Sequence, residues 1–493
     1  MKKFQDASIE EIEDVLHKAT DAFSIYRKSN GFERSNFLYA IAARLISNEE
    51  VLIELAHKET HLERGRLKLE LQRTVFQLHT YGHAAAQGFG HEIRIDKAQT
   101  NPFHPDLRKM NVPLGPVLVF GASNFPFAYS TAGGDTACAL AAGCTVIVKA
   151  HHAHAETSES VSSIIQQVAM ECQLPEGVFS HIHGTEFEIG ERLVMHPLVK
   201  AVGFTGSLSG GKALFDLSNR RLHPIPVFAE MGSTNPVFIL PEKLKEGDVL
   251  SKSLLHSITQ SAGQFCTNPG LLVVLESEQL PYFEQSLAEG MAATAPVAML
   301  HDGIAKHFRQ IRTAITTIKG VEMVAVTAAT YKDHESIPTL AKVSAEVFIQ
   351  NPFLRQEVFG PFSMLVICKN KTEMLKVATV LDGQLTCTLI GTNEEIKAYV
   401  TLIDQLQEKC GRFILNGVPT GVEVAHAMHH GGPYPATTDS RFTSVGPDGI
   451  KRFMRPICYQ NWSNDLLPDE LKDENPLQLW RLVNNEWTKN PVH

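Results

Sequence analysis

From Pro116 onward the chain alternates between short apolar runs and stretches with helical spacing, and this alternation restricts the fold more than any other feature of the sequence. Runs of this length that are apolar on both faces indicate strands covered by helices above and below, as in a doubly wound parallel sheet. Phe127–Ala142 and Ser209–Asn219 are expected to be two of these helices. The first five strand candidates are Val117–Phe120, Thr145–Val148, Phe179–His183, Ala201–Phe204 and Pro226–Ala229.

A second alternation begins after Gly232 and predicts a second α/β unit. Residues 8–90 carry helical spacing instead, and Ser8 with Glu11 forms a capping box at the start. The alternating segment His91–Ile95 and a second segment that ends at Pro113 predict a hairpin lying off the main body. The strand candidates of the second unit are Val237–Leu240, Leu271–Leu275, Ser363–Cys368, Cys387–Ile390 and Arg412–Asn416.

The composition is that of an ordinary globular protein and argues against several classes of function. The net charge is −9 and no basic stripe runs along the chain, so nucleic acid is not expected as a partner. No apolar run reaches the roughly 18 residues of a membrane helix, and the N-terminus turns acidic at Asp6 without an apolar stretch, so no signal peptide is expected. The eight cysteines show neither CxxC pairs nor zinc-type spacing. We therefore expect a cytoplasmic protein with free thiols and no metal site.

One cysteine stands in a polar turn. Cys266 lies within Ser261–Gly270, between a helical pattern and the apolar run Leu271–Leu275. A thiol among small and polar residues suits contact with a substrate, and its ionised form is the reactive one. The alternative for this stretch alone is a buried, inert cysteine.

Polar residues also follow several predicted strands. In parallel α/β sheets, ligands bind beyond the carboxyl ends of the strands. That rule selects Gly121–Asn124, Lys149–His152, Thr205–Ser207 and Glu230–Gly232. Taken singly, Asn124 could satisfy turn amides and Glu230 could be a solvated charge, so the prediction rests on their occurring together.

Five stretches in register resemble the NAD(P)-dependent aldehyde dehydrogenase superfamily over about residues 10–460. They are Gly121–Pro126, Phe204–Ser207, Glu230–Gly232, Gly263–Cys266 and Glu357–Pro361. The resemblance implies an α/β fold with two doubly wound parallel-sheet domains and a small β element for oligomerisation, assembled as a homodimer or a dimer of dimers.

The resemblance also implies a division of the chain. Residues 1–90 and 113–229 would form the dinucleotide-binding domain, and residues 230–440 the catalytic domain. Residues 91–112 and 454–493 would form the oligomerisation hairpin and a C-terminal extension.

By the same resemblance, Cys266 is the nucleophile that adds to the carbonyl carbon of a small aldehyde. The side chain of Asn124 and the backbone N–H of Cys266 would stabilise the oxyanion. Glu230 matches the general base that activates water to hydrolyse the thioester.

The fingerprint GxGxxG is absent after the first predicted strand, yet the resemblance implies a dinucleotide elsewhere. Gly206 and Ser207 would lie at the pyrophosphate, since a helix N-terminus offers free N–H groups. Lys149 matches a ligand of the adenosine ribose. His152 stands where NAD-preferring members often carry glutamate, so NADP is slightly favoured over NAD.

The nicotinamide end would be held by two residues of the fifth stretch. Glu357 matches the carboxylate that binds the nicotinamide ribose, with Phe359 beside the ring.

Two further segments resemble one branch of the superfamily. Glu230–Thr234 lacks the usual lysine, and His430–Asp439 is rich in glycine and proline. The branch oxidises α-ketoglutaric semialdehyde (2,5-dioxopentanoate) to 2-oxoglutarate in sugar-acid or hydroxyproline breakdown. The alternative is a broad or long-chain aliphatic aldehyde dehydrogenase that uses NADP.

A substrate with a distal carboxylate needs a cation, and an arginine fork grips a carboxylate at two atoms. Arg73 and Arg441 are candidates, although each could equally be a surface ion pair. Phe125, Phe127 and Phe265 could line the aldehyde tunnel.

Overall fold

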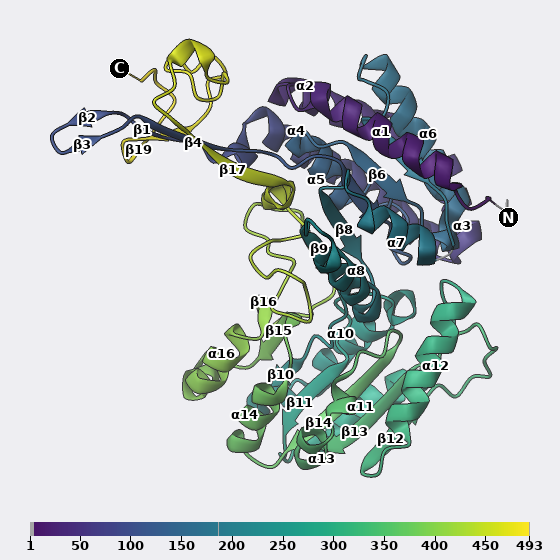
Figure 1. Cartoon of the computed structure of the whole chain (residues 1–493). Coiled ribbons are helices and arrows are strands. Elements are labelled where there is room, and N and C mark those ends of the chain that lie inside the picture. Colours follow the sequence, from purple (N-terminus) through teal and green to yellow (C-terminus); the bar gives the residue numbers. More distant parts are fainter. Residues whose placement is uncertain (1–3, 186, 493) are drawn as a thin grey trace.

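The computed structural model describes residues 4–185 and 187–492 (Figure 1). Four helices come first, and the predicted capping box opens the first of them. Ser8 Oγ accepts a hydrogen bond from the Glu11 amide at 3.2 Å, while the Glu11 carboxylate accepts one from the Ser8 amide at 2.7 Å. The helices are α1 (Ile9–Tyr26), α2 (Gly31–Ser47), α3 (Glu49–Thr60) and α4 (Arg64–Ala86).

The first sheet is parallel, as the alternating pattern predicts, and its strand order is β7-β6-β5-β8-β9. Its strands are β5 (Val117–Phe120), β6 (Val146–Lys149), β7 (Phe179–Ile182), β8 (Ala201–Thr205) and β9 (Val227–Glu230). One face packs against α1, and both faces are apolar because helices cover each of them. The remaining helices of this unit are α5 (Gly134–Ala142), α6 (Ala155–Glu171), α7 (Phe187–Met195) and α8 (Leu208–Arg220).

The helix expected over Phe127–Ala142 begins only at Gly134. Residues 127–133 form turns, in which the Gly134 amide donates to the Ala128 carbonyl at 3.0 Å and the Ala122 amide to the Tyr129 carbonyl at 2.9 Å. These bonds hold the loop that carries Asn124 against the carboxyl end of β5.

The second sheet has the order β12-β13-β14-β11-β10-β15-β16 and is parallel except for its edge strand β12. The sequence pattern missed β12 and β13. Polar residues interrupt both, because β12 lies at the exposed edge and Lys342 projects from β13. The strands are β10 (Val237–Ile239), β11 (Leu271–Leu275), β12 (Val321–Val326), β13 (Thr339–Ser344), β14 (Phe362–Cys368), β15 (Gln384–Ile390) and β16 (Cys410–Leu415).

Helices also cover the second sheet, and Figure 1 shows the two sheets as separate layered units. The helices are α9 (Pro241–Leu244), α10 (Gly247–Thr259), α11 (Leu280–Ala293), α12 (Asp302–Thr316), α13 (Ala345–Gln350), α14 (Lys371–Val380), α15 (Asn393–Ile396) and α16 (Val400–Gln407).

A third, small sheet projects away from both units (Figure 1). Its order is β17-β4-β1-β18-β19, so the adjacent strands β4 and β1 lie between strands from the C-terminal part of the chain. A short hairpin, β2 with β3, forms its tip. That this element contacts another subunit stays a prediction, as do the domain boundaries. The strands are β1 (Arg94–Asp96), β2 (Gln99–Thr100), β3 (Phe103–His104), β4 (Leu107–Pro113), β17 (Met454–Gln460), β18 (Arg481–Val483) and β19 (Glu486–Thr488).

Within the described residues, none of the helices combines the length and the apolarity needed to cross a bilayer.

Candidate active site

Cys266 lies in a tight turn that the backbone of Gly263 makes possible. Ser261, Ala262 and Gly263 have φ values of 49°, 56° and 64°, which reverse the chain just before the cysteine. A Cβ atom on Gly263 would lie 2.4 Å from the carbonyl of Gly360, so only glycine fits there. The turn thus brings Cys266 against the segment that precedes β14.

Asn235 fixes the far side of this turn. Its Nδ2 donates to the carbonyls of Cys266 at 2.8 Å and Asn268 at 3.0 Å. Gln384 Oε1 in turn accepts from the amides of Thr234 and Asn235 at 2.9 and 3.1 Å. The cysteine is therefore anchored to the start of β15 and to the β9–β10 connection.

Glu230, the last residue of β9, points into the same site and is only 2% exposed. Its Oε1 lies 2.9 Å from Nε2 of His430, and its Oε2 accepts a hydrogen bond from the Ser444 hydroxyl at 2.5 Å. A buried carboxylate needs such partners, because an isolated charge in an apolar environment is strongly destabilised.

His430 connects Glu230 to Cys266. The same Nε2 that faces Glu230 lies 3.6 Å from Sγ of Cys266. Its other nitrogen, Nδ1, is buried and has no hydrogen-bond partner among the described residues. From the sequence, His430 was only part of the segment His430–Asp439 and had no predicted role. A histidine placed directly before a Gly-Gly pair was the available signal.

These contacts set opposite charge states for the acid and the thiol. Burial raises the pKa of Glu230, but His430 and the Ser444 hydroxyl more than offset this and hold it below the usual value. Burial, and next the negative charge of Glu230, raise the pKa of the Cys266 thiol well above its usual value. The resting site therefore combines an ionised carboxylate with a protonated thiol.

Asn124 lies beside the cysteine turn. Its Nδ2 donates to the carbonyl of Gln264 at 3.1 Å, and its own backbone carbonyl accepts from Nη2 of Arg66 at 2.7 Å. An amide NH₂ has two N–H groups, so one remains for a ligand.

Arg66, on α4, was not singled out from the sequence. Its guanidinium lies 4.8 Å from the ring centre of Phe125 and 5.5 Å from that of Phe265, the residue before Cys266. The two rings contact each other edge to face at 5.6 Å. Nε and Nη1 of Arg66 are buried without a hydrogen-bond partner among the described residues, although Nη1 lies 3.7 Å from the Glu70 carboxylate.

The other substrate candidates lie in different surroundings. Arg73 donates to the carbonyl of Val422 and, at 3.4 Å, to the hydroxyl of Tyr129. Phe127 is 1% exposed and packs in the core of the helical layer. The side chain of Arg441 is 79% exposed and pairs with Asp439 at 2.5 Å, so it is a surface ion pair.

The predicted cofactor residues lie at the carboxyl ends of the first sheet. Lys149 ends β6 and is half-buried. Gly206 and Ser207 are exposed at the start of α8, where Ser207 Oγ caps the helix by accepting from the Gly210 amide at 3.2 Å. An exposed helix start of this kind fits a pyrophosphate.

His152 is exposed and belongs to a group of histidine rings. It stacks on His151 with ring centres 4.5 Å apart, and the ring centre of His301 lies 5.7 Å away. Partial loss of solvent beside the neighbouring rings, and next the positive charge of Lys149, lower the pKa of His152. His301 was not found from the sequence because it caps α12, far along the chain.

Glu357 and Phe359 line one cavity together with Phe265. A Cβ atom on Gly232 would lie 2.5 Å from Oε2 of Glu357, so the glycine lets the backbone approach the carboxylate. Burial raises the pKa of Glu357 to about 7. Both residues therefore lie near Phe265, the residue before Cys266.

Known proteins resemble this chain over nearly its full length. Residues 1–455 match the Aldehyde dehydrogenase family. An alpha-ketoglutaric semialdehyde dehydrogenase 2 of Azospirillum brasilense is 44% identical over 97% of this chain and 92% of its own length. An alpha-ketoglutaric semialdehyde dehydrogenase of Acinetobacter baylyi is 42% identical over 99% of this chain and 93% of its own.

Solved structures share the fold at much lower identity. A 3,6-anhydro-L-galactose dehydrogenase is 22% identical with a TM-score of 0.79, covering 92% of both chains. A Staphylococcus aureus betaine aldehyde dehydrogenase in complex with NAD+ is 18% identical with a TM-score of 0.79, covering 92% of this chain and 88% of its own. The prediction of an aldehyde dehydrogenase-like α/β fold is thereby confirmed. The chain is an oxidoreductase and belongs to the aldehyde dehydrogenase family.

Proposed function

We propose that this protein oxidises α-ketoglutaric semialdehyde to 2-oxoglutarate with a nicotinamide dinucleotide. The observation that carries the proposal is the contact of Cys266 with His430, which in turn binds Glu230. The two relatives above 40% identity bear the name of this activity. A role in sugar-acid or hydroxyproline breakdown stays a prediction.

The first step is addition of the Cys266 sulfur to the aldehyde carbon, which becomes tetrahedral. The thiol must lose its proton, and the ionised carboxylate of Glu230, which lies within 4.8 Å of the sulfur, can accept it. The aldehyde oxygen then carries negative charge, and the free N–H of the Asn124 amide would stabilise it.

The dinucleotide would lie along the carboxyl ends of the first sheet. Lys149 would bind the adenosine ribose, and the start of α8 at Gly206 and Ser207 would bind the pyrophosphate. Glu357 and Phe359, which lie near Phe265, would hold the nicotinamide riboside. When bound, the nicotinamide ring supplies the hydride acceptor, and the oxidised carbon stays on Cys266 as a thioester.

Hydrolysis of the thioester needs a base that is ionised near neutral pH. His430 and Ser444 hold the pKa of Glu230 low against the effect of burial, so its carboxylate is charged. It can accept a proton from water that attacks the thioester.

Arg66 is the best-placed cation for the distal carboxylate of the substrate. Its guanidinium lies near the rings of Phe125 and Phe265 next to Cys266. Its Nε has no hydrogen-bond partner among the described residues, while its Nη1 lies 3.7 Å from Glu70. Arg73 instead contacts Val422 and Tyr129, and Arg441 forms an exposed pair with Asp439. A C5 oxo acid therefore suits this site better than the alternative, an uncharged long-chain aldehyde.

For the cofactor, NADP is the slightly favoured form. No carboxylate stands at His152 to repel a 2′-phosphate, and Lys149 lies close enough to His152 to lower its pKa.

Changes at Cys266 and Glu230 should separate the two chemical steps. Cys266→Ala should abolish oxidation but leave cofactor binding intact. Glu230→Gln should keep a stoichiometric burst of reduced cofactor, whereas turnover after the burst falls by about 10²–10⁴, the usual share of a general base. Stopped-flow absorbance of the reduced nicotinamide measures both phases. Full turnover in Glu230→Gln would remove the base assignment.

His430→Gln should move the acidic limb of the pH–rate profile to higher pH. Glu230 works as the carboxylate, so turnover falls when the pH drops through its pKa; without the imidazole, burial raises that pKa. The rate after the burst, measured from pH 4.5 upward, reports the shift. The neighbouring His429→Gln is the control and should leave the limb in place. An unmoved limb in His430→Gln would contradict the coupling.

Arg66→Met should lower kcat/KM for substrates with a carboxylate and leave it nearly unchanged for uncharged aldehydes. Loss of a charge-assisted hydrogen bond, about 1.5–3 kcal/mol, predicts a fall of about 10- to 150-fold in kcat/KM for the C5 semialdehyde. For hexanal the change should stay below about threefold, because no carboxylate is lost. Arg441→Met is the matched control and should affect neither substrate. Equal losses for both aldehydes would instead mean that Arg66 acts by holding the Asn124 loop.

His152→Glu should shift the cofactor preference towards NAD. A carboxylate near a 2′-phosphate is a repulsive pair, so the ratio of kcat/KM for NADP to that for NAD should fall by about tenfold or more. His152→Gln removes the imidazole without adding charge and should change the ratio much less. A ratio that stays constant in His152→Glu would mean that His152 does not lie near the 2′-position of the adenosine ribose.

A further inference from the structure

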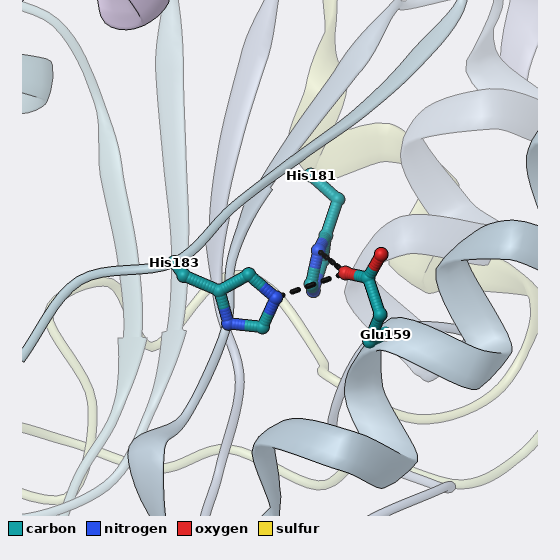
Figure 2. Close-up of side chains that lie close together, drawn as sticks. All are labelled: Glu159, His181 and His183. Carbon is teal, nitrogen blue, oxygen red and sulfur yellow. Dashed lines mark hydrogen bonds and ion pairs between the residues drawn. The ribbon is translucent and has the colours of Figure 1, made fainter. Parts of the chain in front are cut away.

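We propose that Glu159, His181 and His183 form a binding site for a divalent transition cation of the zinc type. The three side chains point toward one another from a helix and a strand end (Figure 2). Within the described residues, only two groups of three such side chains bring their ligand atoms within 4.8 Å of one another. The other is Glu230, Cys266 and His430, which belongs to the catalytic site.

The register of β7 brings the two imidazoles together. His181 lies on β7 and His183 follows its last residue, so they are two positions apart and project to the same face. That face meets α6, which carries Glu159. Glu159 Oε2 lies 2.9 Å from Nε2 of His183 and 3.3 Å from Nδ1 of His181.

These separations suit a small cation. Zinc bonds of 2.0–2.1 Å in a tetrahedron place neighbouring ligand atoms roughly 3.4 Å apart. Two of the three distances already lie near this value. Imidazole and carboxylate together are ligands that zinc and cobalt accept.

Neighbouring contacts hold both rings in place. Nε2 of His181 lies 2.9 Å from Oγ of Ser158, and that hydroxyl lies 2.5 Å from Oγ1 of Thr131. Because a hydroxyl both donates and accepts, this contact persists when Nδ1 loses its proton to a metal. The His183 ring stacks on Phe4, with ring centres 4.0 Å apart and planes inclined by 7°. Such outer contacts are usual around metal-bound histidines.

Solvent can reach the proposed cation site. The side chain of Glu159 is 43% exposed and that of His183 16%, which leaves a way in from solvent and room for a water ligand.

The site does not depend on the proposed function. Its three ligands come from α6 and the end of β7 in the first unit, and a bound cation would join that helix to that strand. Because none of the ligands is a cysteine, the absence of zinc-type cysteine spacing does not count against it.

The test is titration of the full chain with Co²⁺ followed by visible absorption, in a Cys266→Ala background that removes the thiol of the catalytic group. We expect one equivalent to bind with the intense bands of low-coordinate cobalt, and Zn²⁺ to displace it. His183→Ala should abolish these bands. His196→Ala is the matched control, because His196 pairs with Glu13 at 3.3 Å and these side chains are 16% and 42% exposed, nearly as in the proposed site.

Glu159→Gln provides a second test in case His183→Ala does not fold, since an amide keeps the shape of the carboxylate. It should bind Co²⁺ at least tenfold more weakly while the thermal midpoint of the apoprotein stays within a few degrees. No cobalt bands in the parent protein, or bands that persist in His183→Ala, would overturn the proposal. Equal weakening in His196→Ala would also overturn it.

Discussion

The buried carboxylate of Glu230 is the interaction on which the site depends. A charge with 2% exposure is tolerated only because His430 and Ser444 bind both of its oxygens. Both partners lie beyond β16, some 200 residues further along the chain, whereas Glu230 ends the first sheet. The need to satisfy one carboxylate therefore ties the last part of the second unit to the edge of the first, and Cys266 lies where they meet.

The same arrangement creates a conflict at the sulfur. Burial and Glu230 keep the thiol protonated, although the thiolate is the form that attacks carbonyl carbon. The positive charge of Arg412 acts in the opposite direction. Glu230 itself relieves the conflict, because its ionised carboxylate lies within 4.8 Å of the sulfur and can accept the proton of the thiol. The resting enzyme thus keeps a less reactive thiol until a proton moves over a few ångströms.

Local pattern was enough to predict the strands of the first sheet, since both of their faces are apolar and their ends carry the polar residues. Local pattern failed where contacts with distant parts of the chain determine the structure. The strands β12 and β13 carry polar residues, and the chain before Gly134 forms turns although it is apolar. The roles of His430 and Arg66 arise from contacts across 164 and 58 residues, which no spacing rule reveals. The five motifs, taken together, predicted the family and the catalytic residues, which hydrophobic periodicity alone does not indicate.

The small sheet has a consequence for how the protein is made. Among the described residues, β17 alone covers the outer edge of β4 and β18 alone covers that of β1, so a growing polypeptide exposes two open strand edges once Pro113 has been added. At about 5–20 residues per second, roughly 20–70 s pass before the ribosome reaches Met454. Open edges of this kind are templates for pairing with other chains. Neighbouring ribosomes on one messenger RNA therefore present each other with the same unfinished sheet during that interval.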